Sequence, residues 1–215
     1  MHLLSRFLRL FFYLLYHPFA QSYDLISWTV SLGLWKNWVS NIVPFIQGTR
    51  VLELGHGPGH LQRLLLDRDL LPVGLDESRQ MGYLAQKRLR YIGYAQPKLA
   101  RGLAQSLPFP VNTFDTIVAT FPSEYFLEER TLSEVRRTLT NGGRFVVLPV
   151  AWITGKGALD RLMSWLFQFT SQAPVDPIQE VSEKLKTPFE EAGFAVETRE
   201  VEVKSSLLLI LIATK

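Results

Sequence analysis

Short apolar runs that alternate with helical segments are the feature that most restricts the fold of this chain. The runs are rich in Val, Leu and Ile, and each is bounded by Gly, Pro or Asp. They lie at residues 50–55, 71–76, 97–102, 114–120 and 143–149. Runs of this length and composition are typical of parallel strands that are buried on both faces of a sheet.

Helical spacing of apolar residues fills the intervals 59–69, 77–92 and 127–139. This order predicts an α/β fold in which successive β-α units form a doubly wound sheet. The C-terminal part differs, because residues 194–204 alternate like a strand and a second apolar strand follows across a very short connection. Such a connection permits only an antiparallel hairpin. The sequence therefore predicts a seven-stranded, mostly parallel sheet with an antiparallel last strand.

Two aromatic segments lie outside this pattern. Residues 1–46 indicate an N-terminal helical segment, which we expect to form a cap or lid on the main domain, residues 47–215. A second apolar helical stretch is expected as an insertion at about 152–178. Both segments suit core packing, a contact between subunits, or an apolar entrance for a lipid or quinone. A monomer and a homodimer therefore both stay open.

The first twenty residues raise the question of targeting. Arg6 and Arg9 interrupt the apolar stretch, so the longest uninterrupted run, residues 10–16, falls well short of the ~18 residues that span a bilayer. Polar side chains share one helical face, which predicts an amphipathic helix that lies on a surface. Pro18 and the absence of cysteine argue against export. We expect a cytoplasmic protein whose N-terminus contacts a membrane, a second subunit or its own core.

Charge and cysteine content exclude several kinds of site. The formal net charge is only +3 and the basic residues are scattered along the sequence, which gives no footprint for nucleic acid. The chain has no cysteine, so thiolate metal sites and thiol catalysis are excluded. His56 and His60 have helical spacing, but His56 lies in a glycine turn and no zinc motif surrounds it. We therefore expect neither a metal nor a nucleic-acid partner.

The sequence VLELGHGPGH, residues 51–60, forms the end of the first predicted strand and the turn after it. Ligands of doubly wound sheets bind outside the carboxyl ends of the strands, so this turn is expected at the site. Gly55, Gly57 and Gly59 allow a sharp turn and a close approach, since a Cβ would block either the dihedral angles or the contact. Asp76 ends the second strand, and its two oxygens suit the two hydroxyls of a ribose.

Two nucleotide ligands use this layout. A dinucleotide favours the spacing G-x-G-x-x-G, whereas the spacing here is G-x-G-x-G and His60 follows. The carboxylate of Glu53 would repel a pyrophosphate and attract a cation. A sulfonium nucleoside with a charged amino-acid tail, S-adenosylmethionine, suits the ribose-binding acid, the tight turn and the nearby carboxylate together.

These motifs resemble those of the class I S-adenosylmethionine-dependent methyltransferases, in particular the type 11 group with its quinone-biosynthesis and lipid methyltransferases. The glycine turn matches the first motif, and the later motifs correspond to residues 73–78, 101–120 and 132–149. The resemblance covers about residues 48–150. It implies a Rossmann-like methyltransferase fold and methyl transfer from S-adenosylmethionine to a small, hydrophobic or lipid-like acceptor, with S-adenosylhomocysteine as the product.

The resemblance also assigns roles to single residues. The expected cofactor-binding residues are Tyr23, Glu53, Gly55, His56, Gly57, Gly59, Asp76, Glu77, Leu103, Ala104, Gln105 and Thr120. Leu103 departs from the family, which usually carries an Asp at this position to read the adenine amino group. Adenine recognition would then fall to main-chain groups at 104–107 or to Gln105.

Three side chains are candidates for catalysis. Glu124 and Tyr125 follow the fourth predicted strand, where the family contacts the acceptor, so Glu124 could act as a base and Tyr125 could stack on the acceptor. A Glu at a helix N-terminus is explained as readily by the helix dipole. His17 lies in the N-terminal segment, which in related enzymes folds over the cofactor.

The assignments have structural and functional alternatives. Asp76 could instead cap a helix, and Glu53 could pair with Arg50 or Arg63. An NAD(P)-dependent oxidoreductase is the alternative enzyme. Leu103 keeps open a catalytically inactive, membrane-peripheral binding protein of the same fold.

Overall fold

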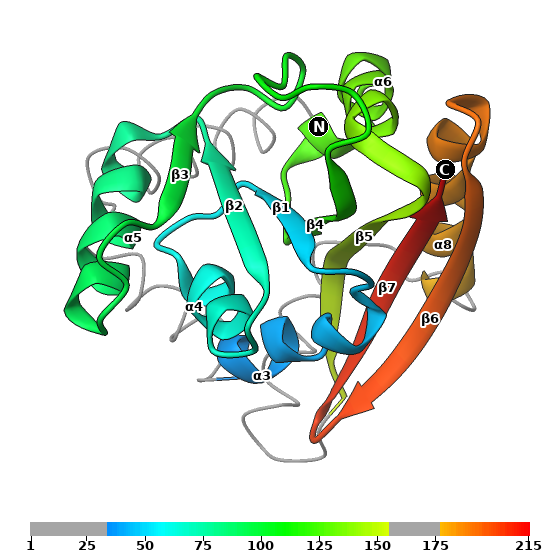
Figure 1. Cartoon of the computed structure of the whole chain (residues 1–215). Helices are drawn as coiled ribbons and strands as arrows, with labels where there is room; N and C mark the ends of the chain where they lie inside the picture. The colour runs from blue at the N-terminus through cyan, green and yellow to red at the C-terminus, as the bar shows by residue number, and fades with distance from the viewer. Residues whose placement is uncertain (1–33, 155–176) are drawn as a thin grey trace, which may run out of the picture.

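The computed structural model describes residues 34–154 and 177–215, which form a seven-stranded sheet in the order β3-β2-β1-β4-β5-β7-β6 (Figure 1). The strands are β1 (Arg50–Leu54), β2 (Leu71–Asp76), β3 (Lys98–Arg101), β4 (Phe114–Thr120), β5 (Leu139–Ile153), β6 (Ala195–Val203) and β7 (Ser206–Thr214). The first five pair in parallel, and β7 is antiparallel to both of its neighbours. The predicted α/β fold is confirmed.

Helices connect the strands and cover both faces of the sheet. The described α-helices are α3 (Trp35–Ser40), α4 (His60–Leu66), α5 (Arg79–Tyr91), α6 (Glu129–Thr138) and α8 (Pro177–Glu191), and short 3-10 helices lie at Val43–Phe45 and Glu124–Leu127. From β1 the chain proceeds outward to β2 and β3, and then returns to β4 on the other side of β1. The strand order therefore reverses between β1 and β4, which is where such sheets bind ligands.

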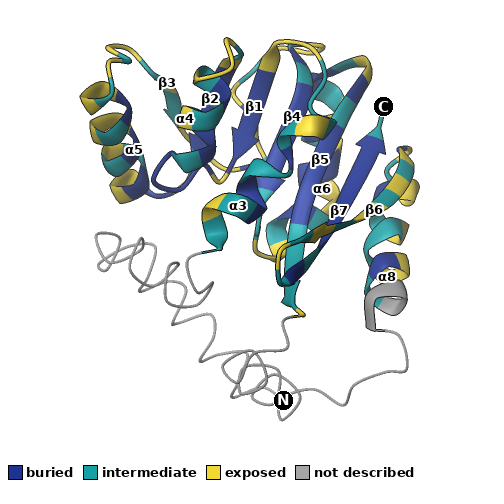
Figure 2. Cartoon of the chain, turned by 90° about the horizontal axis from the view of Figure 1, so that it is seen from below, coloured by how far each residue is buried: buried dark blue, intermediate teal, exposed yellow. Residues whose placement is uncertain are grey.

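Adjacent residues of the central strands contribute to two different cores. Leu52 of β1 packs with Phe145 and with the side chains of α6 and α8, whereas its neighbour Val51 packs with Leu61 and Leu65 of α4. The same alternation continues along β5 and β7, whose buried residues are prominent in Figure 2. Side chains of a strand point to opposite faces, so a sheet covered on both sides needs continuously apolar strands.

β5 is longer than the strand predicted at 143–149. It begins directly after α6 and continues to Ile153, so Trp152 pairs with Leu207 and Ile153 pairs with Ser206 of β7. The expectation that the insertion at 152–178 begins as a helix is therefore wrong at its start. Pairing with the long second strand of the hairpin decides the conformation, because aromatic and β-branched side chains suit a pleated surface. Residues 155–176 lie outside the described residues.

Two connections also differ from the expectation of continuous β-α units. A loop and not a helix joins β3 to β4. Conversely, α8 begins at Pro177 where no helix was predicted, and Val181, Leu185 and Phe189 follow with helical spacing. Phe189 is completely buried. The spacing was a usable signal, but Pro188 within it normally interrupts a helix.

The N-terminal cap predicted at residues 1–46 is described from residue 34 onward. In this part α3 buries Trp38 and Val39 in the core on the α4 side of the sheet, and Ile42, just before the 3-10 helix, is buried in the same core. The remaining residues, 1–33, lie outside the described residues, so the amphipathic helix expected there stays a prediction. Within the described ranges, no helix is both long and apolar enough to cross a membrane.

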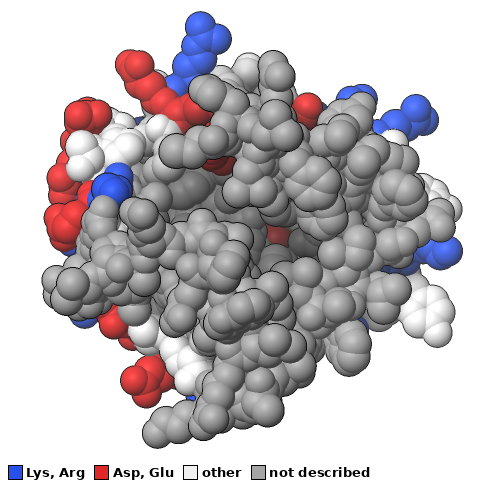
Figure 3. Space-filling model, turned by 180° about the vertical axis from the view of Figure 1, so that it is seen from behind, with Lys and Arg blue, Asp and Glu red and all other residues white. Residues whose placement is uncertain are grey.

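The outer edge of the sheet at β6 is strongly charged. Glu197, Glu200 and Glu202 are exposed on this strand, and acidic side chains gather along the left margin of the view in Figure 3. Among the strands that the structure describes, β6 pairs with β7 alone. Charges on an edge strand disfavour pairing with a second chain, so this edge is protected against edge-to-edge association.

Candidate functional site

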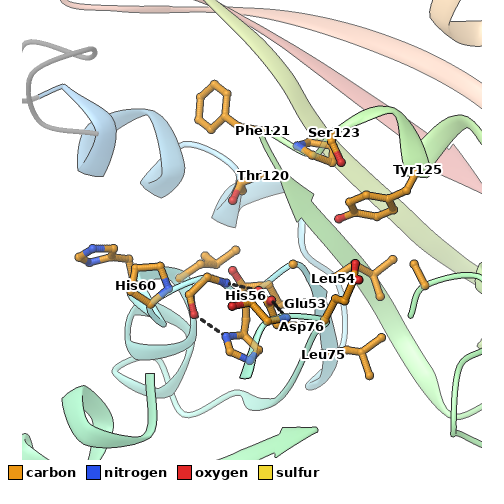
Figure 4. A pocket seen from close by; sticks show the side chains of 18 of the residues that line it. Glu53, Leu54, His56, His60, Leu75, Asp76, Thr120, Phe121, Ser123 and Tyr125 are labelled. Atoms are coloured by element: carbon orange, nitrogen blue, oxygen red, sulfur yellow. Dashed lines mark hydrogen bonds between the residues drawn. The ribbon is translucent and has the colours of Figure 1, made fainter. Parts of the chain in front are cut away.

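A cavity of about 260 Å³ opens at the carboxyl ends of β1, β2 and β4. Its walls come from the glycine turn after β1, the end of β2, the loop after β3 and the loop after β4, and α3 closes a further side (Figure 4). These segments are distant in the sequence, and the reversal of strand order brings them together. The cavity therefore lies where the strand pattern predicted a ligand site.

The three glycines of the turn meet different surroundings, although all have positive φ angles of 68° (Gly55), 51° (Gly57) and 82° (Gly59). A Cβ on Gly55 would lie 3.0 Å from the hydroxyl of Tyr125, and one on Gly59 would lie 3.0 Å from the Cβ of Ala85 in α5. A Cβ on Gly57 would meet nothing within 4 Å. Gly59 thus permits close packing of two helices, whereas Gly57 leaves open space at the wall of the cavity.

The carboxylate of Asp76 ties the glycine turn to the end of β2. Its Oδ2 accepts a hydrogen bond from the Gly57 N–H at 2.8 Å, and its Oδ1 accepts one from the Ser78 N–H at 2.8 Å. Asp76 does not cap α5, because the Ser78 hydroxyl does so by accepting from the Met81 N–H. A carboxylate offers about four acceptor positions, so Asp76 retains capacity for donors from a ligand.

Glu53 is a buried acid at the bottom of the cavity. Only 2% of its surface is exposed, and its Oε2 accepts a hydrogen bond from Gln62 Nε2 at 2.8 Å. Burial raises the pKa of Glu53 to about 8; the hydrogen bond from Gln62 opposes this shift and the charge of Asp76 adds to it. The acid is therefore mostly protonated at neutral pH as long as no cation lies beside it.

The ion pairs considered for Glu53 in the sequence do not form. Arg50 bonds to Asp115 at the opposite end of the strands, and Arg63 of α4 pairs with Asp67, the residue that follows this helix. Glu53 has an uncharged partner instead, which sequence spacing did not reveal. The glutamine lies nine residues further along the chain, on the helix that follows the turn.

His56 packs against the glycine turn and contacts its main chain. Its ring is buried, its Nδ1 lies 2.6 Å from the Gly57 carbonyl oxygen, and a Cβ on Gly74 would come within 2.9 Å of its Cδ2. Burial lowers the pKa of His56, and the charge of Asp76 opposes that shift. A neutral ring that donates from Nδ1 to the carbonyl explains these contacts. His56 therefore supports the turn.

Aromatic side chains form the wall opposite the two acids. The rings of Trp35 in α3 and Phe121 after β4 lie 4.4 Å apart between centroids, and both line the cavity. Phe121 has a φ of 49°, and its N–H donates to the Leu148 carbonyl at 2.7 Å. A positive φ on a bulky residue costs about 1 kcal/mol or more and persists where the surroundings hold it. Sequence reasoning missed both residues, since no local signal marks their contact.

The cavity gathers most of the predicted cofactor residues. Those that line it are Glu53, Gly55, His56, Gly57, Asp76, Glu77, Leu103, Ala104, Gln105 and Thr120. Tyr125 also lines it, with its hydroxyl at Gly55. Glu124 is exposed and does not line the cavity. His17 and Tyr23 lie outside the described residues.

At the wall where adenine is expected, some polar groups already form hydrogen bonds within the protein. Leu103 is half exposed at this wall. The N–H of Leu107 donates to Glu134 at 2.8 Å, and the side-chain amide of Gln105 donates to Glu128 at 2.8 Å. Of the groups that the sequence nominated for adenine, the main chain at Ala104 and Gln105 is therefore better placed than the Gln105 amide or the Leu107 N–H, since both residues line the cavity.

The described lining is acidic. It contains the carboxyl groups of Glu53, Asp76 and Glu77 but no Lys or Arg. Such a surface disfavours a pyrophosphate and favours a ligand with a positive charge. Within the part of the chain that the structure describes, no group of three or more potential ligands is arranged for a metal ion.

Comparison with known proteins agrees with this geometry. Residues 51–143 match the model of a family described as a methyltransferase domain. This part of the chain is therefore similar to a methyltransferase domain, in agreement with the resemblance that the sequence motifs indicated. The chain is similar to a demethylmenaquinone methyltransferase of Thermotoga maritima, with 34% identity over 140 residues that cover 62% of this chain and 59% of that protein. The chain therefore spans about three fifths of the length of this relative.

Two further similarities extend the comparison. A ubiquinone/menaquinone biosynthesis C-methyltransferase UbiE, from Blochmanniella floridana, is 30% identical over 149 residues, which cover 66% of this chain and 59% of that protein. The solved magnesium protoporphyrin IX methyltransferase of Synechocystis, with bound S-adenosylhomocysteine, shares the fold with a TM-score of 0.55 and 17% identity, covering 84% of this chain and 83% of that one. A methyltransferase structure from Archaeoglobus fulgidus gives a TM-score of 0.60 at 16% identity, covering 90% and 99%.

Proposed function

We propose that the chain transfers a methyl group from S-adenosylmethionine to a small, hydrophobic, quinone-like acceptor. The observation that carries this proposal is the cavity at the strand ends, where the described lining combines three carboxyl groups with no Lys or Arg. A ligand bound there must tolerate or use negative charge. A sulfonium nucleoside does so, whereas a dinucleotide pyrophosphate does not.

The residues present fit this cofactor. Asp76 has acceptor capacity for the ribose hydroxyls, Glu53 provides a carboxyl group for the cationic amino-acid end, and Gly57 leaves space beside both. When bound, S-adenosylmethionine supplies an electrophilic methyl group on a sulfonium. The chain itself has to hold the donor and the acceptor in line and to exclude water.

A general base is needed only if the acceptor must lose a proton. Glu124 is not positioned for that role, because it is exposed outside the cavity. Tyr125 is better placed, since its side chain reaches the glycine turn at Gly55 (Figure 4). We assign Tyr125 to contact with the cofactor or acceptor.

The acceptor is proposed to be apolar from the character of the opposite wall. Trp35, Val39, Phe121 and Pro122 line that side of the cavity. Flat aromatic side chains suit a ring-shaped acceptor, which binds them by stacking and by burial of apolar surface. The names of two similar proteins, which refer to demethylmenaquinone and to ubiquinone/menaquinone biosynthesis, point to the same class of molecule.

Calorimetric titration tests the cofactor. S-adenosylhomocysteine should bind, and NADH should not, because the described lining lacks a cation for its pyrophosphate. Absence of S-adenosylhomocysteine binding at millimolar ligand would remove the basis of the proposal. A second assay with labelled methyl donor, applied to quinone precursors, extracted lipids and polar metabolites, identifies the acceptor; transfer only to polar metabolites would contradict the apolar class.

We also propose that residues 1–20 contact a membrane surface, because their polar and apolar side chains separate onto two helical faces. Co-sedimentation with anionic liposomes, with and without these residues, measures the contact. Greater partitioning of the full chain is expected. Identical partitioning of the two forms would contradict the proposal.

A further inference from the structure

The contact between Gln62 and Glu53 is a buried interaction to which the sequence assigned no role. We propose that Gln62 positions the Glu53 carboxyl group to receive the cationic amino-acid end of the cofactor, and that Glu53 gives up a proton when this end binds. The inference rests on the proposed function, since it concerns the same cavity. It makes Gln62 a positioning residue, and it makes cofactor affinity depend on pH.

The orientation of Gln62 is determined by two acceptors. Only 1% of this residue is exposed, and its Nε2 lies 2.8 Å from Glu53 Oε2 and 3.4 Å from the Val73 carbonyl oxygen. Both partners accept hydrogen bonds, so the NH₂ group of the amide must face them. Gln62 therefore holds one oxygen of Glu53 from the α4 side. The other oxygen remains for a donor in the cavity, which Glu53 lines (Figure 4).

The charged groups around Glu53 do not stabilise its ionised form. Asp76 faces it from β2, and its negative charge disfavours a second carboxylate. His56 lies in the turn, where burial lowers its pKa, so it does not supply a positive charge near neutral pH. The cavity is also lined by Glu77 and His60, but by no described Lys or Arg. The pKa of Glu53 is accordingly raised to about 8.

An ammonium group at the cofactor's amino-acid end would change this balance. It donates hydrogen bonds and carries the charge that the described lining lacks, so the ionised carboxylate becomes the favoured form beside it. The O–H bond of Glu53 breaks, and the proton passes to the solvent while a hydrogen bond from the ammonium forms. Since the free acid is mostly protonated at pH 7, about one proton should be released per ligand bound.

The experiment counts protons on the full chain. Calorimetric titration with S-adenosylhomocysteine is carried out at pH 7 in buffers that differ in ionisation enthalpy. Methylthioadenosine is the matched control ligand, because it keeps the nucleoside and lacks the amino-acid end. We expect release of about one proton with S-adenosylhomocysteine and none with methylthioadenosine. Between pH 6 and 8, affinity for S-adenosylhomocysteine should rise up to about tenfold per pH unit, while affinity for methylthioadenosine stays constant.

Two variants test the roles of the two side chains. Glu53→Gln should abolish both the proton release and the pH dependence. Gln62→Leu removes a donor from the Glu53 carboxyl group and from the Val73 carbonyl oxygen. It should weaken S-adenosylhomocysteine binding about tenfold at pH 7 and leave methylthioadenosine binding unchanged, because only the ligand with an amino-acid end uses the carboxyl group. Gln86→Leu, at an exposed position on α5, is the control. Equal weakening of both ligands in Gln62→Leu would show a merely structural role.

The outcomes separate this inference from the proposed function. If neither ligand binds the unmodified chain, the proposed function fails. If S-adenosylhomocysteine binds without proton release and with an affinity independent of pH, only the coupling is overturned. The proton count on the unmodified chain needs no variant, so the inference stays testable even if Gln62→Leu does not fold.

Discussion

Two acids at opposite ends of adjacent central strands have contrasting surroundings. Asp115, at the start of β4, accepts hydrogen bonds from the main-chain N–H groups of Thr49 and Arg50 and forms an ion pair with the Arg50 side chain. Glu53, near the end of β1, has one uncharged amide as its partner and is buried beside a cavity. The same type of functional group thus has a cationic partner at one end of the strands and an uncharged partner at the other.

The pKa values of the two acids shift in opposite directions. The hydrogen bond from Arg50 holds the pKa of Asp115 below its usual range, whereas burial raises the pKa of Glu53 to about 8. A carboxylate that is paired with a cation of the same chain stabilises the folded state. A buried carboxyl group without a cation contributes less to stability and can still bind a cationic ligand. The comparison teaches that the acid at the amino end of β4 stabilises the fold, while the acid near the carboxyl end of β1 is left without a cation, which a ligand can supply.

The largest expected effect is a gain in stability of the Glu53→Gln variant at high pH. The folded state holds the Glu53 proton more tightly than the unfolded state, so Glu53 should lower the free energy of unfolding as pH rises from about 4.5 to about 8. The slope is roughly 1 kcal/mol per pH unit. The variant should lack this contribution. At pH 8 its free energy of unfolding, and with it the urea concentration at the unfolding midpoint, should therefore be higher than for the unmodified chain. Parallel pH profiles for variant and unmodified chain would contradict the burial of a titrating acid.

Asp76→Ala should give the largest loss of binding. It removes the proposed acceptor for the ribose hydroxyls and the acceptor for the Gly57 N–H, so affinity for S-adenosylhomocysteine should fall about 100-fold. Calorimetric titration measures the change. Glu190→Ala, which removes an exposed acid from α8, serves as the control and should bind normally. An unchanged affinity in Asp76→Ala would exclude the assigned ribose contact.

Gly57→Ala and Gly93→Ala form a matched pair, because both glycines have positive φ and neither added Cβ would meet an atom within 4 Å. Each substitution should lower the free energy of unfolding by about 1 kcal/mol through backbone strain. Only Gly57→Ala should also weaken S-adenosylhomocysteine binding, by about tenfold or more, since its methyl group enters the cavity wall. Equal affinities in the two variants would mean that the space at Gly57 is not used.

The smallest effect is expected at the other acid. Asp115→Asn should lower the free energy of unfolding by about 1 kcal/mol at pH 7, because the ion pair with Arg50 is largely at the surface. A depressed pKa means that the stabilisation exists above the unfolded-state pKa and is lost as pH falls through the folded-state value. The difference between variant and unmodified chain should therefore shrink below pH 4. Cofactor affinity should not change. A loss of affinity would contradict the conclusion that Asp115 stabilises the fold and takes no part in ligand binding.

Much of the fold followed from the sequence because its signals are local. The apolar runs at 71–76 and 114–120 coincide with β2 and β4, and the glycine turn lies at the cavity as predicted. The limits of β5 were missed, because its last residues are strand only through pairing with β7. The helix α8 was missed because Pro188 interrupts an otherwise helical spacing.

The sequence by itself determined the backbone of the site: strands buried on both faces, a turn that only glycines permit, and an acid at the end of each of two strands. The tertiary structure alone decided the partners. It gave Glu53 an amide in place of an arginine, placed Phe121 against Trp35, and left Glu124 outside the cavity. The reason is that dihedral preferences act between neighbours in the chain, whereas burial and hydrogen bonding depend on which distant segments the sheet brings together.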